Sequence, residues 1–420
     1  MQASPSFISI LTFNWSWHSS PVSIRFAHSM EQNQTCPHFP SCSGCDHWGL
    51  QPEAELQRKI DDLQNLVQGL YPQGLVQNLE FRSLPLRDRV DFRLQNGKLG
   101  LLERDTKALI DLPECPVLSP ALNQFLTRVR TLVPQLCQHL RIATLRLRVG
   151  PQQSSEKIQQ GLWIDAANAD IRKLLDDREL VQKLTEICVL EIGQRKKTPY
   201  WDSVRERYGL RESEPKQFWA GLFNKHYVSL YSAVGGFTQP SMVSSCALNL
   251  AISEMLQTIQ PEVSYEWGAG IGAMSLPFWE HSRTHVCLEK EAELNDAFRM
   301  NLASLGVTNT ILQEGDFSRA SFAEVRSQID FEVKIPGLKN KTCDVLFLNP
   351  PRSGTGKFLQ GLTNETRPKH LIYLSCNPES MIRDLTEIAP HYELQKALLV
   401  NQFPHSRHSE ALIWLQRKNH

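Results

Sequence analysis

Beyond about residue 230, short apolar strands alternate with helices, and this alternation is the strongest constraint on the fold. The sequence predicts helices over Met242–Ile259 and Ala292–Leu305. Strands are expected to end at Glu266 and to cover Val286–Leu288, Asp344–Leu348, Leu371–Ser375 and Ala411–Leu415. Strands that are joined through helices form parallel sheets with helices on both faces. We therefore expect an α/β, Rossmann-like domain with a mostly parallel sheet over residues 226–420.

The preceding region is predicted to form a smaller, β-rich domain over residues 30–225. Arg89–Leu94 alternates, Asn96-Gly97 is a two-residue turn, and Lys98–Glu103 continues, which is typical of a β-hairpin. Further strands are expected over Ala143–Val149 and Glu186–Ile192. The region is rich in basic residues, which form either a solvated sheet face or a local surface for nucleic acid: Arg87, Arg89, Arg93, Arg141, Arg146, Arg148, Arg195, Lys196 and Lys197.

Charge and cysteine content limit the class of protein. The 420 residues include 45 Lys or Arg and 45 Asp or Glu, so the formal net charge is zero, which excludes a globally basic nucleic-acid coat. No apolar run approaches the roughly 18 residues of a membrane span.

Ten cysteines are too sparse and irregular for a disulfide scaffold, which favours a cytoplasmic protein with metal-binding or reactive cysteines. Residues 1–29 lack a basic signal-peptide start, and we interpret them as a disordered extension or an over-long start.

A glycine-rich turn follows the first strand of the α/β region. Gly268, Gly270 and Gly272 let the chain turn tightly and approach a ligand closely. Gly268, Gly270 and Ala273 also fit a dinucleotide-binding fingerprint. Glu266, two residues before the first glycine, favours S-adenosylmethionine, whose amino-acid end it would approach, and Glu289 at the end of the next strand would accept both ribose hydroxyls. A purely structural strand–turn–helix remains the alternative.

Polar groups follow three later strands at the edge where ligands bind in such sheets. Asn349-Pro350-Pro351-Arg352 forms a rigid wall, for which a capped turn is the alternative. Cys376 ends the next strand beside Asn377-Pro378, although a buried cysteine is usually inert. Glu410 precedes the last strand and could reach the same pocket, or it could be an ordinary surface residue.

These motifs together resemble the RNA 5-methyluridine methyltransferases, over residues 36–418. The set comprises Phe237-Thr238-Gln239, Glu266–Gly272, Glu289, Asp316, Asn349–Arg352, Ser375–Pro378 and Pro404–Glu410. The resemblance implies a class I methyltransferase fold that uses S-adenosylmethionine. It implies that Cys376 adds to C6 of uracil, which turns C5 into a nucleophile, and that Glu410 removes the C5 proton. It also implies that Gln239, Gly268, Glu289 and Asp316 line the cofactor, and that Asn349 and Arg352 border the cofactor and the target base.

The resemblance is greatest to the iron–sulfur members that modify 23S rRNA. The spacing of Cys36, Cys42 and Cys45, with Cys115 before a proline, matches their pattern, which implies a 4Fe–4S cluster. Zinc, which four thiolates also suit, is the alternative on spacing alone. With 35 residues before Cys36, the N-terminal β-barrel of some relatives is not expected, so the β-rich domain would grip RNA. We expect a monomer without membrane contact.

Three positions depart from the family. Asn349 stands where Asp is usual, Ser241 where Asn is frequent, and Gly268-Ala269 where an aromatic-Cys pair is usual. Three other functions remain open: a tRNA uridine-C5 methyltransferase, an amino-group nucleic-acid methyltransferase suggested by Asn349-Pro350-Pro351, and a non-catalytic RNA-binding protein.

Overall fold

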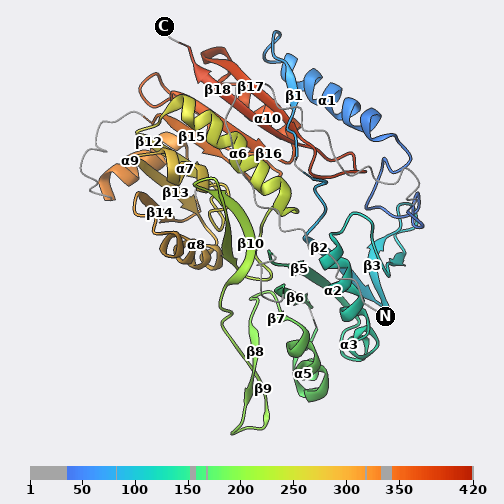
Figure 1. Ribbon diagram of the computed structural model, residues 1–420. Helices are drawn as coiled ribbons and strands as arrows, with labels where there is room; N and C mark the ends of the chain where they lie inside the picture. Colours follow the sequence, from blue (N-terminus) through green and yellow to red (C-terminus); the bar gives the residue numbers. More distant parts are fainter. Residues whose placement is uncertain are drawn as a thin grey trace, which may run out of the picture.

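A computed structural model describes residues 36–81, 83–151, 158–166, 169–316, 319–332 and 343–418 (Figure 1). The extension predicted over residues 1–29 lies outside these ranges. Two sheets organise the described protein, a large one built mainly by the C-terminal half and a smaller one built by the middle of the chain.

The large sheet has eight strands in the order β1-β17-β18-β16-β15-β12-β13-β14. Neighbouring strands from β16 to β14 are parallel, whereas β18 is antiparallel to both β16 and β17. This arrangement confirms the predicted α/β fold with a mostly parallel sheet. The strand bounds are β1 Val76–Asn78, β12 Val263–Trp267, β13 Thr284–Glu289, β14 Thr310–Glu314, β15 Val345–Leu348, β16 His370–Ser375, β17 Tyr392–Val400 and β18 Glu410–Arg417.

Helices cover both faces of the large sheet (Figure 1). Helices α6 and α8 begin and end at the predicted residues, and with α7 they pack on one face, whereas α1, α9 and α10 pack on the other. None of the described helices is both long and apolar enough to cross a membrane. The helix bounds are α1 Pro52–Gln68, α6 Met242–Ile259, α7 Leu276–His281, α8 Ala292–Leu305, α9 Phe322–Glu332, α10 Pro378–Leu385 and the 3-10 helix Ala389–His391.

Two segments that precede helix α6 in the chain also pack with the large sheet. Strand β1 forms one edge of the sheet by pairing with β17, and Leu63 and Val67 of α1 are buried in the core beneath it. The hairpin of β10 (Lys216–Phe223) and β11 (His226–Ser232) buries Trp219 against α6. Both segments cover apolar surface of the large sheet, so the smaller core is built by residues between them.

The smaller sheet has six strands in the order β4-β3-β2-β5-β6-β7. The predicted hairpin is confirmed, and Asn96 and Gly97 in its turn have positive φ values. The strand predicted from Glu186 instead begins at Val189, because Glu186 and Ile187 end helix α5. The bounds are β2 Arg89–Gln95, β3 Lys98–Leu102, β4 Leu109–Asp111, β5 Ile142–Val149, β6 Gln160–Asp165, β7 Val189–Ile192, α2 Pro120–Arg130, α3 Val133–His139, α4 Arg172–Asp176 and α5 Arg178–Ile187.

Candidate active site

A cavity of about 990 Å³ lies where the carboxyl ends of β12, β13, β15 and β16 face the smaller sheet. Most of the residues that the sequence singles out line this one cavity: Cys36, Cys42, Cys45, Cys115, Gln239, Gly268, Gly270, Glu289, Asp316, Asn349, Cys376 and Glu410. Glu266 and Gly272 do not line it. The fold therefore gathers residues more than 300 positions apart around a single space.

The glycine-rich turn after β12 adopts a left-handed backbone. Gly268, Gly270 and Gly272 have φ values of 81°, 60° and 84°, a region that favours glycine. A Cβ at Gly268 would lie 2.5 Å from the backbone oxygen of Asn349, so this residue lets the turn approach the neighbouring strand end. A Cβ at Gly272 would instead meet the ring of Trp279 at 2.8 Å. Gly268 and Gly270 form the cavity wall, and Gly272 serves the packing behind it.

Glu266 lies beneath the turn rather than in the cavity. Its carboxylate is fully buried, accepts a hydrogen bond from Ser275 Oγ at 2.6 Å and lies 3.0 Å from His285 Nε2. Cys287 Sγ is 3.7 Å from the same oxygen. The other oxygen, Oε1, is buried without a hydrogen-bond partner among the described residues. The Glu266 side chain thus lies behind the turn and does not line the cavity, and its approach to the amino-acid end of a cofactor stays a prediction.

Glu289 reaches the cavity with its carboxylate already engaged. Its oxygens accept hydrogen bonds from the backbone N–H groups of Gly270, Lys290 and Glu291, at 2.8, 2.8 and 2.9 Å. A carboxylate has about four lone-pair positions, so about one stays open for a ligand. Glu289 joins the turn to the end of β13, and a ribose with two hydroxyls would meet fewer open acceptors than the sequence suggests.

Cys376 and Glu410 are neighbours because β16 and β18 are antiparallel. Ser375 lies opposite Ala411 in the last pair of this ladder, so the next residue on each strand brings the thiol beside the carboxyl group. Burial raises the pKa of Cys376, and the negative charge of Glu410 raises it further. Arg352 opposes both effects, because its guanidinium hydrogen-bonds the sulfur.

Glu410 is a buried carboxyl group that faces the thiol. Its side chain is 3% exposed, and burial raises its pKa to about 8. A hydrogen bond from the Gln239 side chain acts in the opposite direction. Oε2 of Glu410 is buried and has no hydrogen-bond partner within the described protein. A carboxyl group with a pKa near neutrality can accept a proton from a bound ligand and release it again.

Gln239 is held by a buried residue that sequence reasoning missed. The side-chain amide of Gln402 donates to Oε1 of Gln239 at 3.0 Å, which orients the Gln239 side chain toward Glu410. Gln402 lies in the loop between β17 and β18, and the sequence gives no local signal for it.

A buried ion pair between Glu55 and Lys59 holds the same loop. Glu55 and Lys59 lie on the apolar stripe of α1, 2.7 Å apart and almost fully buried. Lys59 donates to Asn401 Oδ1 at 2.8 Å and to the Phe403 carbonyl at 3.0 Å, and Glu55 accepts from the His405 N–H. Opposite charges four residues apart on the apolar stripe of a helix are the sequence pattern from which this buried pair could have been predicted.

Arginines that the sequence offered as an RNA surface instead support the connector over residues 233–238, which leads to Gln239. Arg148 is fully buried and donates to Ser232 Oγ at 2.9 Å and Thr238 Oγ1 at 2.6 Å. Arg146 forms a bidentate pair with Asp91. These two arginines are committed within the protein, whereas Arg87 and Arg89 of the same predicted set line the cavity.

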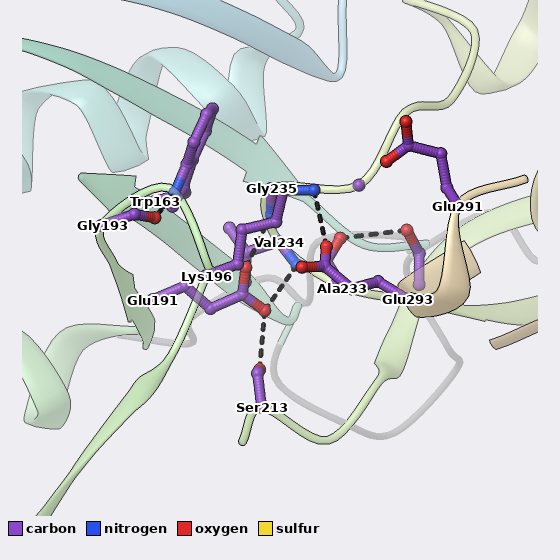
Figure 2. A network of polar contacts seen from close by, with 12 residues as sticks. Trp163, Glu191, Gly193, Lys196, Ser213, Ala233, Val234, Gly235, Glu291 and Glu293 are labelled. Atoms are coloured by element: carbon purple, nitrogen blue, oxygen red, sulfur yellow. Dashed lines mark hydrogen bonds and ion pairs between the residues drawn. The ribbon is translucent and has the colours of Figure 1, made fainter. Parts of the chain in front are cut away.

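A buried glutamate completes this support (Figure 2). Glu191, 1% exposed, accepts hydrogen bonds from the N–H groups of Val234 and Gly235 at 2.9 and 2.8 Å, and from Ser213 Oγ at 2.7 Å. The connector is thus held from β7 and β5 of the smaller sheet, which places Gln239 at the boundary between the two sheets.

The four cysteines predicted to bind a cluster converge on the side of the cavity formed by the smaller sheet. Burial raises the pKa of Cys45 to about 12 and that of Cys115 to about 11, and the other thiols add to this effect. Among the residues the structure describes, no three of these sulfurs lie within 4.8 Å of one another. The four thiols therefore border one side of a single space between the two sheets.

Comparisons with known proteins agree with this geometry. A family model described as tRNA (uracil-5-)-methyltransferase matches residues 224–418. An uncharacterised RNA methyltransferase of Bdellovibrio bacteriovorus is 34% identical over 391 residues, which cover 91% of this chain and 95% of the relative. The 23S rRNA (uracil(1939)-C(5))-methyltransferase RlmD of Acidithiobacillus ferrooxidans is 24% identical and covers 93% of this chain and 85% of its own length. The tRNA (uracil-54, C5)-methyltransferase of Pyrococcus abyssi, solved with S-adenosyl-L-homocysteine, has a TM-score of 0.62 at 17% identity and covers 90% of this chain and 86% of that one.

Proposed function

The chain belongs to the RNA uracil-5-methyltransferase family, and we propose that it methylates C5 of a uridine in 23S rRNA through a covalent bond between Cys376 and C6 of the base. It is an S-adenosylmethionine-dependent enzyme that acts on RNA. The observation that carries the proposed mechanism is the adjacency of Cys376 and Glu410 at the end of the β16–β18 ladder, within the cavity that the glycine turn borders.

The residues of the cavity fit S-adenosylmethionine. The left-handed backbone at Gly268 and Gly270 leaves the wall free of side chains, and Glu289 offers its remaining acceptor position beside it. We assign Asp316 and Asn349 to the same site, because both line the cavity. Asn349, unlike the usual Asp, cannot balance a sulfonium charge, so cofactor affinity depends more on the backbone turn and on Glu289.

The chemistry explains why a thiol and a carboxyl group must be neighbours. The Cys376 thiolate forms a bond to C6, and the electron pair moves to C5, which becomes nucleophilic. S-adenosylmethionine, when bound, supplies the methyl carbon that C5 attacks. Glu410 then takes the C5 proton, the C5–C6 double bond forms again and the bond from C6 to the sulfur breaks. Arg352 favours the thiolate at the start and at the end of this sequence.

We assign Cys36, Cys42, Cys45 and Cys115 as ligands of a 4Fe–4S cluster, which is supported by the convergence of the four thiols at one side of the cavity and by the resemblance of their sequence pattern to that of the iron–sulfur members. The backbone N–H groups of Asp46 and His47, just after Cys45, donate to the carbonyl of His405. A cluster would therefore order the loop that precedes Glu410, which is a structural role.

The 23S rRNA target is supported by the RlmD relatives, which align over more than nine tenths of this chain. The tRNA enzyme of Pyrococcus abyssi shares the fold, and tRNA is therefore the second candidate substrate to test.

A single adduct experiment tests the mechanism. The protein is incubated with S-adenosylmethionine and a 23S rRNA transcript that contains 5-fluorouridine, whose C5 fluorine cannot leave as a proton does. We expect a protein–RNA species that survives denaturing electrophoresis, and we expect it to vanish in Cys376→Ala but not in the control Cys137→Ala. An adduct that persists in Cys376→Ala refutes the assignment, and an adduct with tRNA alone refutes the rRNA target.

The cluster has a separate test. Anaerobically purified protein should contain about four irons per chain and absorb broadly in the visible range. Cys115→Ala should lose the iron, whereas Cys137→Ala should keep it. Stoichiometric zinc in place of iron would refute the assignment.

A further inference from the structure

We propose that the β8–β9 hairpin is a second RNA-binding surface, separate from the cavity, that docks a part of the substrate RNA away from the target uridine. This inference rests on the proposed function in that it takes RNA as the substrate. Strands β8 (Thr198–Asp202) and β9 (Arg207–Arg211) form a two-stranded ribbon that projects beyond the smaller sheet, away from the large sheet (Figure 1).

One face of the ribbon is anchored to the protein. Trp201 lies between the guanidinium of Arg178, 4.2 Å from its ring centroid, and the ring of Tyr208 at 5.3 Å. Tyr208 and Leu210 pack against the core of the smaller sheet. A two-stranded ribbon is marginal by itself, so these contacts give it a defined orientation.

The opposite face of the ribbon exposes an aromatic ring, Tyr200, on which a ligand can stack. The register puts Tyr200 opposite Gly209, and Arg207 and Arg211 lie on the same face, each two residues from Gly209 along the strand. A Cβ at Gly209 would lie 2.8 Å from the Tyr200 ring, so the ring lies directly against the glycine backbone. Tyr200 is nevertheless 37% exposed. One side of the ring is supported by backbone, and the other side is open to a stacking partner.

The charges on this face favour RNA as the partner. Asp202, the carboxylate opposite Arg207, is already engaged by the backbone N–H groups of Val204 and Arg205 and by the Arg205 guanidinium. Arg207 and Arg211 are exposed and have no ion-pair or hydrogen-bond partner anywhere in the described ranges, in contrast to Lys196 and Lys197 at the base of the hairpin, which pair with Glu293 and Glu212. Four residues along a strand separate the two arginines by about 13 Å, with Tyr200 between them. Unpaired guanidinium groups beside an open aromatic ring bind phosphates and stack on a base.

The hairpin is also coupled to the catalytic side. Ser213, two residues after β9, donates to Glu191, which holds Gly235 of the connector that leads to Gln239 (Figure 2). The hairpin thus has a defined position relative to Glu410, the residue that Gln239 contacts. RNA bound on the ribbon would be presented to the cavity at a set distance.

The test measures RNA affinity and its salt dependence with the full chain. The hairpin variant Arg207→Gln/Arg211→Gln is measured for binding to an unmethylated 23S rRNA transcript. The control variant Arg58→Gln/Arg283→Gln removes two exposed charges elsewhere on the protein. Two phosphate contacts contribute about 10- to 30-fold in affinity at about 0.15 M salt, and their loss makes the slope of log K against log salt less negative by about 1.4 to 1.8. We expect these changes in the hairpin variant and not in the control.

Two uncharged variants examine the stacking surface. Tyr200→Ala and Gly209→Val, which would displace the ring, should each weaken binding at least about fivefold with an unchanged salt slope. All hairpin variants should raise KM for methylation and leave kcat at saturating RNA unaltered, because none touches the cavity.

Equal affinity of the hairpin and control variants would overturn the proposal, and so would a fall in kcat without a change in KM. Loss of binding to an acidic protein or to a second copy of this chain, with RNA affinity unchanged, would assign the surface to a protein instead. If the parent protein does not form the Cys376 adduct, the proposed mechanism fails, while the affinity and salt comparison still decides whether the hairpin binds RNA.

Discussion

Replacement of Glu410 by glutamine should separate the two halves of the reaction. Glutamine keeps the shape of the side chain and can still accept the hydrogen bond from Gln239, but it cannot take the C5 proton. Addition of Cys376 and methyl transfer should therefore proceed, and release of the product should stop. General-base catalysis contributes about 10²- to 10⁴-fold, so turnover should fall by that amount.

The pH dependence follows from the pKa of Glu410, which burial raises to about 8. A base acts in its ionised form, so the rate of product release should increase with pH. About a tenth of the groups are ionised at pH 7 and about nine tenths at pH 9, which predicts roughly a tenfold rise. The rate of adduct formation depends on the Cys376 thiolate and is measured as a separate step.

The assay follows a single turnover with a radiolabelled methyl group and separates free RNA from protein-bound RNA on a denaturing gel. The Glu410→Gln protein should accumulate a methylated adduct, and the parent should release methylated RNA at a rate that rises through about pH 8. Glu410→Asp, which keeps a carboxyl group, should retain the rise. Normal release by Glu410→Gln, or a parent rate that is flat from pH 7 to 9, would refute the role of this carboxyl group.

Protein stability gives an independent check on the same residue. In the unfolded chain the carboxyl group ionises near pH 4.5, whereas in the folded protein it stays protonated until about pH 8. The folded state is therefore penalised progressively as pH rises through this window. Glu410→Gln should be more stable than the parent at pH 8, and the difference should disappear near pH 4. A variant that is less stable at pH 8 would contradict the assigned pKa.

Three further substitutions test other parts of the site. Arg352→Gln removes the positive group that lowers the pKa of Cys376. The pH dependence of the rate of adduct formation should therefore shift to higher pH, as measured in quenched single-turnover assays. Lys59→Met leaves Glu55 as an unpaired buried charge and should reduce the free energy of unfolding in urea by about 3 to 5 kcal/mol. Gly268→Ala forces a side chain into a left-handed backbone position and against a backbone oxygen 2.5 Å away, so calorimetry should show loss of S-adenosylmethionine binding.

Control variants separate these effects from a general loss of protein stability. Gly361 also has a positive φ, but a Cβ there would meet no atom within 4 Å, so Gly361→Ala should cost stability and leave cofactor binding intact. Cofactor binding by Gly268→Ala equal to that of the parent would contradict the assigned turn. An unchanged urea midpoint for Lys59→Met, or an unshifted pH profile for Arg352→Gln, would contradict those two predictions.

The sequence determined the order of the elements and the chemistry that each strand end carries. Apolar periodicity located α6 and α8 to the residue, since it reflects which side chains face a core. Glycines, the Pro350-Pro351 pair and Cys376 were identified because their conformational or chemical character is intrinsic to the residue type. The strand predicted from Glu186 was placed too early because a short apolar run suits a helix end as well as a strand.

The tertiary structure decided which of these groups meet. No local pattern shows that β18 is antiparallel to β16, and this reversal is what brings Glu410 beside Cys376 and buries it. Burial also changed the roles of charged residues: Glu266 supports the turn from behind, and Arg148 holds the connector rather than meeting solvent. Periodicity reports a residue's own preference, whereas desolvation and pairing depend on partners that are distant in the chain, such as Gln402 for Gln239.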